Sequence, residues 1–187
     1  ILYDNEVYGL TKGQAGPTLG LGEKPKSLPR PNPQGKVNPL LLAFASGYTW
    51  IARGYAYDVK GLKELIKEGI AHRGLAFLHV LQPCPTYNDL HTKEWFAPRL
   101  YRLEEEGYDP LVPPGLPPEA LEARMARFQQ KALERGERIP VGVFWKAELP
   151  TFEARLKAYL PRYPEAYPAR GPETPLDLEG LLQEFAL

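Results

Sequence analysis

The segment from Asp4 to Gln14, Asp-Asn-Glu-Val-Tyr-Gly-Leu-Thr-Lys-Gly-Gln, carries the residue types best suited to chemistry in this chain. It follows the apolar residues 1–3, which are typical of the end of a strand. In open α/β sheets, ligands bind just beyond the carboxyl ends of the strands. The amide oxygen of Asn5 and nearby carbonyls suit Mg²⁺, and the N–H groups of a Gly-containing turn suit a phosphate. An Asn that only caps a turn is the alternative.

The second group of candidate residues surrounds Cys84, the one cysteine among the 187 residues. It lies in the segment 81–88, Leu-Gln-Pro-Cys-Pro-Thr-Tyr-Asn, directly after an apolar run that predicts a strand. A single cysteine is either a metal ligand or a buried thiol that packs like a small apolar residue. An iron–sulfur cluster needs four thiolates, so this chain cannot hold one alone.

Together these two segments resemble the β subunit of 2-oxoacid:ferredoxin oxidoreductases, which binds thiamine diphosphate. The resemblance covers most of the chain, and its further matches are Asn38-Pro39-Leu40, Ala52-Arg53-Gly54, Thr92, Trp95-Phe96, Arg99 and the run from Arg138 to Lys146. The family usually has Ser-Pro-Thr after the Gln, where this chain has Ala15-Gly16-Pro17-Thr18. The Pro-rich loop 19–36 also departs from the family pattern.

The resemblance implies a role for each residue of the two segments. The side-chain oxygen of Asn5 and the backbone carbonyl of Val7 would bind the Mg²⁺ that anchors the diphosphate. Residues 9–11 (Gly9, Leu10 and Thr11) would contact the phosphates, and Leu10 and Lys12 would lie near the reacting carbon. Lys12 would offer positive charge to the substrate, with a solvated loop lysine as the alternative. Cys84 would be the fourth thiolate of a four-iron, four-sulfur cluster, with three cysteines from outside this chain.

The implied activity is the oxidative decarboxylation of a 2-oxoacid to acyl-CoA and CO₂, with electrons passing to ferredoxin. The implied partners are an α subunit (or a fused αγ subunit), ferredoxin, coenzyme A and the 2-oxoacid. Two alternatives remain open: a non-oxidative decarboxylase or synthase that depends on thiamine diphosphate, and a truncated fragment without activity. The chain has no initiator Met and begins inside a predicted strand, so we expect it to be the carboxyl portion of a longer protein.

Composition excludes several other classes of protein. The formal net charge is zero, which gives no electrostatic attraction to nucleic acid or to an anionic membrane. No apolar run approaches the roughly 20 residues of a membrane-spanning helix. One cysteine is consistent with a reducing cytoplasm. The 21 prolines, with one Met and one Cys, predict a thermophilic source.

The pattern of apolar runs alternating with helices predicts an α/β fold, a doubly wound parallel sheet covered on both faces. Expected strands are 48–53, 75–81 and 139–145, and expected helices are 39–46, 58–73, 119–135, 152–160 and 176–187. We expect residues 1–103 to form the carboxyl part of the cofactor-binding domain, incomplete at its N-terminus. Residues 104–187 would form an extension with a Pro-rich tail over 161–175.

The three histidines show no spacing typical of metal ligands. His79 alternates within an apolar run, so we expect it in the core with its ring nitrogens hydrogen-bonded. His72 lies near a helix end, where the helix dipole favours a cation. His91 has no predicted role, and the run 104–106 of three Glu residues is expected to be solvated.

Overall fold

The computed structural model describes residues 1–160 and residue 183. Its contacts divide the chain into two compact units, Ile1–Leu149 and Pro150–Leu187. The second unit contains α5 (Phe152–Tyr159), which begins at the predicted residue and is capped by the Thr151 side chain. The predicted tail and, apart from residue 183, the predicted last helix lie outside the described residues. The domain boundary at residue 103 stays a prediction, and the contacts place their own division after residue 149.

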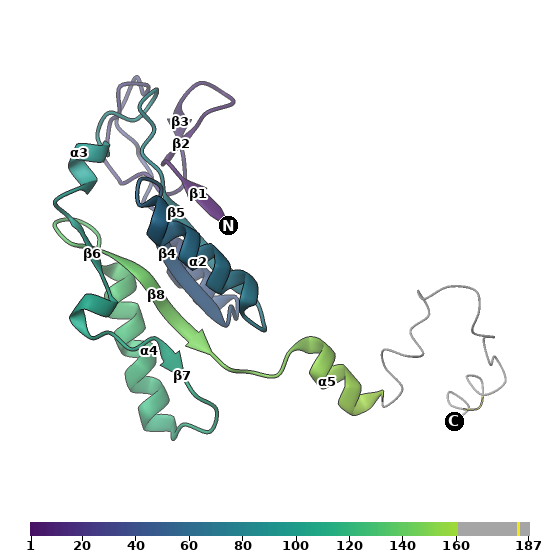
Figure 1. Cartoon of the computed structure of the whole chain (residues 1–187). Coiled ribbons are helices and arrows are strands. Elements are labelled where there is room, and N and C mark those ends of the chain that lie inside the picture. Colours follow the sequence, from purple (N-terminus) through teal and green to yellow (C-terminus); the bar gives the residue numbers. More distant parts are fainter. Residues whose placement is uncertain (161–182, 184–187) are drawn as a thin grey trace. The chain divides into compact units, whose positions relative to one another are not determined.

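A six-stranded sheet forms the centre of the first unit (Figure 1). Its strands lie in the order β1 (Leu2–Asp4), β5 (Ala76–Leu81), β4 (Trp50–Tyr55), β8 (Ile139–Ala147) and β6 (Leu100–Arg102), and β7 (Leu111–Val112) also pairs with β8. The neighbours β1, β5 and β4 are parallel, as predicted. Strand β8 is antiparallel to β4, so the sheet is mixed, and the extension beyond residue 103 contributes β7 and β8 to it.

Helices cover both faces of this sheet, which confirms the predicted α/β architecture. Helix α2 (Val59–Ala71) packs on one face against Trp50 and Ala52. Helices α1 (Pro39–Ala45) and α4 (Pro118–Leu133) pack around Ile51 on the other face. Neighbouring residues of β4 thus enter opposite cores, as the alternation of side chains along a strand requires.

The helix ends follow from local sequence. The Asn38 side chain accepts hydrogen bonds from the backbone N–H groups of Leu40 (3.1 Å) and Leu41 (3.3 Å), which caps α1. Asp58 caps α2 in the same way, through the N–H of Gly61 at 3.0 Å. Gly47 follows α1 with φ 82°, a conformation that favours glycine. These caps confirm the predicted starts of both helices.

The pairing of β1 with β5 brings the two candidate segments together. Leu2 lies opposite His79 and Asp4 opposite Leu81 in a parallel register, so both strands end at the same edge of the sheet. The Asp4–Gln14 segment and the Cys84 segment therefore leave the sheet side by side. None of the described helices is both long enough and apolar enough to cross a membrane.

Candidate functional site

The motif after β1 folds into a turn and a short hairpin. Strand β2 (Val7–Tyr8) pairs with β3 (Gln14–Ala15), and the Gly13 N–H donates to the Tyr8 carbonyl at 2.7 Å to close the loop. The predicted phosphate-contacting residues 9–11 and Lys12 are exposed at the tip, where Lys12 has a φ of 77°. The backbone and side chains of this tip are therefore open to a ligand.

Asn5 stands where β1 ends and is half-buried. Its side-chain oxygen accepts the Val7 N–H at 3.2 Å, an Asx turn that points the amide oxygen back over the chain. Both residues line a mostly apolar cavity of about 540 Å³, which also borders Leu2, Tyr3, Asp4, Tyr8, Pro39, Leu42, Tyr48 and Phe77. A cavity of about 640 Å³ lies elsewhere, between α2 and the residues from β6 to β8, and contacts none of the predicted site residues.

Asp4 is buried directly beneath this turn. One carboxylate oxygen accepts hydrogen bonds from the Glu6 N–H (3.1 Å) and from the Thr18 hydroxyl, and the other contacts His79 Nε2 at 2.8 Å. Burial alone would raise the pKa of Asp4, but the hydrogen bonds from His79 and Thr18 outweigh burial and hold the pKa below its usual value. Asp4 is therefore an anionic anchor for the turn.

His79 connects this anchor to the core, as predicted for a hydrogen-bonded core histidine. Its ring is inaccessible to solvent, and the Arg53 Nε–H donates to its Nδ1 at 3.3 Å. Because Arg53 is a donor, Nδ1 accepts, and the ring proton on Nε2 is donated to Asp4. Burial lowers the pKa of His79 to about 4, so the ring is neutral at pH 7.

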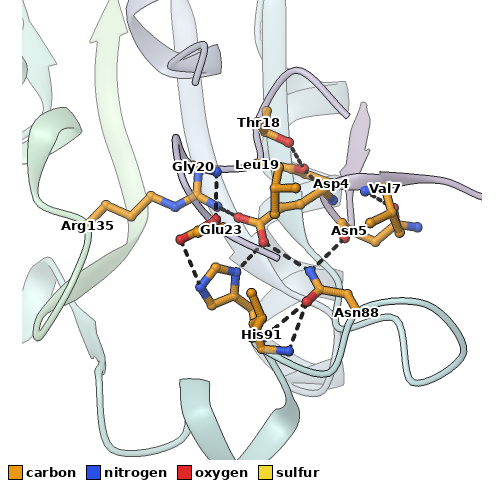
Figure 2. Close-up of polar contacts among 12 residues, drawn as sticks. Asp4, Asn5, Val7, Thr18, Leu19, Gly20, Glu23, Asn88, His91 and Arg135 are labelled. Atoms are coloured by element: carbon orange, nitrogen blue, oxygen red, sulfur yellow. Dashed lines mark hydrogen bonds and ion pairs between the residues drawn. The ribbon is translucent and has the colours of Figure 1, made fainter. Parts of the chain in front are cut away.

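Glu6, the next residue after Asn5, is 5% exposed and has a φ of 67°. A left-handed conformation costs a non-glycine residue roughly 1–2 kcal/mol. Its carboxylate accepts hydrogen bonds from Arg135, from His91 and, at 3.1 Å, from the Asn88 amide. Figure 2 shows how these three side chains converge on the turn from different parts of the chain.

The Cys84 segment is tied to the same turn. The thiol of Cys84 is free and half-buried, and the residue's carbonyl accepts the Asn88 N–H at 3.0 Å. The Asn88 amide group also donates to the Asn5 carbonyl at 3.3 Å, and its oxygen accepts the N–H groups of Leu90 and His91. A single buried amide therefore joins the two candidate segments.

Comparisons with known protein families find a match for each of the two segments. Residues 1–80 match the family model of the thiamine pyrophosphate enzyme C-terminal TPP binding domain. Residues 84–160 match the family model of the C-terminal part of the pyruvate ferredoxin oxidoreductase beta subunit. A 2-oxoacid:ferredoxin oxidoreductase subunit beta from Sulfolobus sp is 58% identical over 172 residues, 91% of this chain and 55% of the relative. Over both segments, this chain matches the β subunits of 2-oxoacid:ferredoxin oxidoreductases.

Two further proteins show the same similarity. The β subunit from Saccharolobus solfataricus is 50% identical over 193 residues, 98% of this chain and 62% of the relative. The chain thus spans little more than half the length of these two β subunits. A solved structure of 2-oxoglutarate:ferredoxin oxidoreductase from Magnetococcus marinus, with 2-oxoglutarate, coenzyme A and succinyl-CoA bound, has a TM-score of 0.71 and 26% identity. That match covers 99% of this chain and 57% of the other.

The residues of the two motifs fit the cofactor chemistry to different degrees. Asn5 fits a magnesium site, because an amide oxygen at a strand end is a ligand type that Mg²⁺ accepts. Val7 is buried beside it. Cys84 fits one of the four thiolate ligands of an iron–sulfur cluster, and the 187 residues contain no second cysteine.

The sequence patterns did not predict several residues that the structure brings to the site. One oxygen or nitrogen atom from each of Glu6, Glu23 and His91 lies within 4.8 Å of the others, although the three residues are far apart in sequence. Thr18 and Arg135 were also missed. Only Asn88 had a sequence signal, because it ends the segment around Cys84.

Proposed function

We propose that this chain forms part of the cofactor site of a 2-oxoacid:ferredoxin oxidoreductase, which converts a 2-oxoacid and coenzyme A to acyl-CoA and CO₂ and passes electrons to ferredoxin. One observation carries the proposal: the Asn5 turn and the Cys84 segment leave neighbouring parallel strands and are joined by Asn88. A decarboxylation centre and an electron-transfer centre have to lie close together, and this arrangement supplies one ligand position for each.

The residues of the first segment would hold thiamine diphosphate through Mg²⁺. Asn5 would supply its side-chain oxygen and Val7 its carbonyl to the cation. Gly9, Leu10 and Thr11 would give N–H and hydroxyl donors to the diphosphate from the exposed hairpin tip. Thiamine diphosphate supplies the electron sink for decarboxylation, and the protein supplies binding and orientation. Leu10 and Lys12 would face the substrate.

Cys84 would bind one iron of a four-iron, four-sulfur cluster whose remaining thiolates come from outside these 187 residues. An α subunit (or a fused αγ subunit) would complete the site. Ferredoxin and coenzyme A would be further partners, and the complex would work in the cytoplasm. The composition and the relatives from Sulfolobus and Aeropyrum support a thermophilic source.

The decisive test is anaerobic assay of the complete β subunit with its partner subunit. We expect reduction of ferredoxin that requires a 2-oxoacid, coenzyme A, Mg²⁺ and thiamine diphosphate together. Pyruvate, 2-oxoglutarate and a branched-chain 2-oxoacid should be compared. CO₂ release without an electron acceptor would instead support a non-oxidative decarboxylase, and a folded complex that binds no thiamine diphosphate would support an inactive fragment.

Replacing Lys12 by Met should slow turnover at saturating 2-oxoacid by about tenfold. This is less than the roughly 100-fold lost when a donor enclosed in an active site is removed, because Lys12 lies on an exposed tip. Steady-state ferredoxin reduction measures the effect. The matched control is Lys24→Met in the exposed loop, and a turnover of Lys12→Met equal to that control would remove Lys12 from the substrate site.

Replacing Cys84 by Ser should remove the cluster's visible absorption and abolish ferredoxin reduction. A serine hydroxyl is not readily deprotonated at neutral pH, whereas iron–sulfur clusters are held by thiolates. Binding of thiamine diphosphate should persist, because Asn5 and the hairpin are unchanged. Absorption and electron paramagnetic resonance spectra measure the cluster, and an unaltered cluster signal in the variant would show that Cys84 is an inert thiol.

A further inference from the structure

The backbone of Glu6 sets the relative orientation of Asn5 and Val7, because it is the one residue between them. Its left-handed φ of 67° reverses the chain at this point. A non-glycine residue keeps this conformation only when its surroundings determine it strongly. Contacts from other parts of the chain must therefore impose it.

The backbone of Glu6 is held from both sides. Its N–H donates to Asp4 at 3.1 Å, and its carbonyl accepts the Gly16 N–H at 2.7 Å. Gly16 packs so closely that a Cβ there would lie 2.9 Å from the Glu6 carbonyl oxygen. The chain thus has a glycine at the point where the hairpin passes the turn.

The side chain of Glu6 is held by three partners from two distant segments. Arg135 follows α4, 129 residues along the chain, and donates to one carboxylate oxygen. Asn88, at the end of the Cys84 segment, and His91, three residues further on, donate to the other. The side chains of Glu6 and Arg135 are only 4% and 12% exposed, so the ion pair is shielded from solvent.

We propose that Glu6 is a positioning residue for the Mg²⁺ ligands and that its pairing with Arg135 sets the affinity of the cation site. This inference rests on the proposed function. Through Glu6, the segment after α4 and the Cys84 segment both act on a turn that neither of them adjoins in sequence. Both oxygens of the carboxylate already accept hydrogen bonds from these donors, so its role is to hold the turn rather than to bind the cation.

The test is titration of the complete β subunit, assembled with its partner, with MgCl₂ at saturating thiamine diphosphate. Isothermal titration calorimetry reports the apparent Kd for Mg²⁺. We expect Arg135→Met to raise this Kd about tenfold. This is the lower end of what loss of a residue that supports a metal ligand costs, because Arg135 acts on Asn5 and Val7 only through Glu6. Arg135→Lys should restore part of the affinity, and kcat at saturating Mg²⁺ should change little, because Glu6 and Arg135 touch no reacting atom.

Two further variants separate positioning from general stability. Glu6→Gln removes the charge without changing size, and combining it with Arg135→Met should raise the Kd no further than one change alone, as expected for two members of one pair. Arg124→Met is the control, since Arg124 lies on α4 and its ion pair with Asp109, at 3.0 Å, is more exposed. It should leave the Kd unchanged.

The two proposals fail in different ways. Variants of Glu6 and Arg135 that lower the melting temperature but keep the wild-type Mg²⁺ affinity would contradict the inference and leave the proposed function standing. Wild-type protein that binds neither Mg²⁺ nor thiamine diphosphate would contradict both.

Discussion

Replacing Asn5 by Ala should raise the Mg²⁺ and thiamine diphosphate concentrations needed for activity by at least about 100-fold. Loss of a residue that only hydrogen-bonds to a metal ligand costs up to about 100-fold in affinity, and Asn5 would itself be a ligand. The change removes the oxygen that stands at the end of β1 and leaves the apolar wall of the cavity in place. Calorimetric titration of the complete β subunit with its partner measures both affinities. Ferredoxin reduction under saturating cofactor measures what activity remains.

Two variants control for this effect. Asn5→Asp keeps an oxygen ligand at the same position and should lose far less affinity, because carboxylates are also Mg²⁺ ligands. Gln34→Ala removes an exposed amide from the Pro-rich loop and should change nothing. Equal affinities in Asn5→Ala and wild-type protein would mean that Asn5 only caps the turn.

Replacing His79 by Leu should lower the free energy of unfolding by about 3–5 kcal/mol, the cost of breaking a buried charge network by removing one member. The imidazole bridges Asp4 and Arg53, and the three residues are at most 7% exposed. Leucine fills most of the volume but leaves the Asp4 carboxylate and the Arg53 guanidinium without their shared partner. Urea denaturation of the complete protein, followed by tryptophan fluorescence, measures the change.

His72→Ala is the matched control for the loss of a histidine. His72 is half-buried at the end of α2, where it contacts the Thr49 hydroxyl at 2.8 Å, so its removal should cost about 1 kcal/mol. A His79→Leu variant no less stable than this control would show that the buried network does not stabilise the fold.

The stability that His79 confers should depend on pH. Its pKa is about 4 in the folded protein because of burial and near 6.5 in the unfolded chain. The unfolded chain therefore takes up a proton first on acidification, and the contribution of His79, complete above pH 6.5, is lost as the pH falls toward 4. The difference in unfolding free energy between wild type and His79→Leu should shrink over this range.

Local sequence predicted the parts of the fold whose signals are local. The caps Asn38 and Asp58, the apolar runs of β4 and β5, and the core position of His79 all depend on neighbours within a few residues or on alternation along one strand. A parallel sheet was predicted, and the antiparallel pairing of β8 with β4 was not, because the same apolar run can form either kind of strand. This pairing depends on how the chain returns after α4, which is a tertiary property.

In the candidate site too, only the residues with a local sequence signal were predicted. The segments around Asn5 and Cys84 were found because their residues are contiguous. The partners of Glu6 were missed because Arg135 is 129 residues away and His91 is 85. Thr18 was noted only as part of a departure from the family pattern, yet its hydroxyl satisfies Asp4. Contacts of this kind depend on which elements the sheet places side by side. They cannot be predicted from the spacing of residues along the chain.

The parallel pairing of β1 with β5 also bears on how this sequence can change over time. Both functional segments are fixed to the sheet by their strands and to each other by Asn88. The first part of the loop over residues 19–36 is also attached to both segments, because Ser27 donates to the Gly13 carbonyl at 2.7 Å and Lys26 donates to the Pro85 carbonyl at 2.8 Å. The buried Asn32 amide then closes this part of the loop by donating to the carbonyls of Leu19, Gly20 and Gln34. Insertions or deletions at the exposed residues 35–36, after this closed part, can therefore accumulate while the two sites keep their spacing.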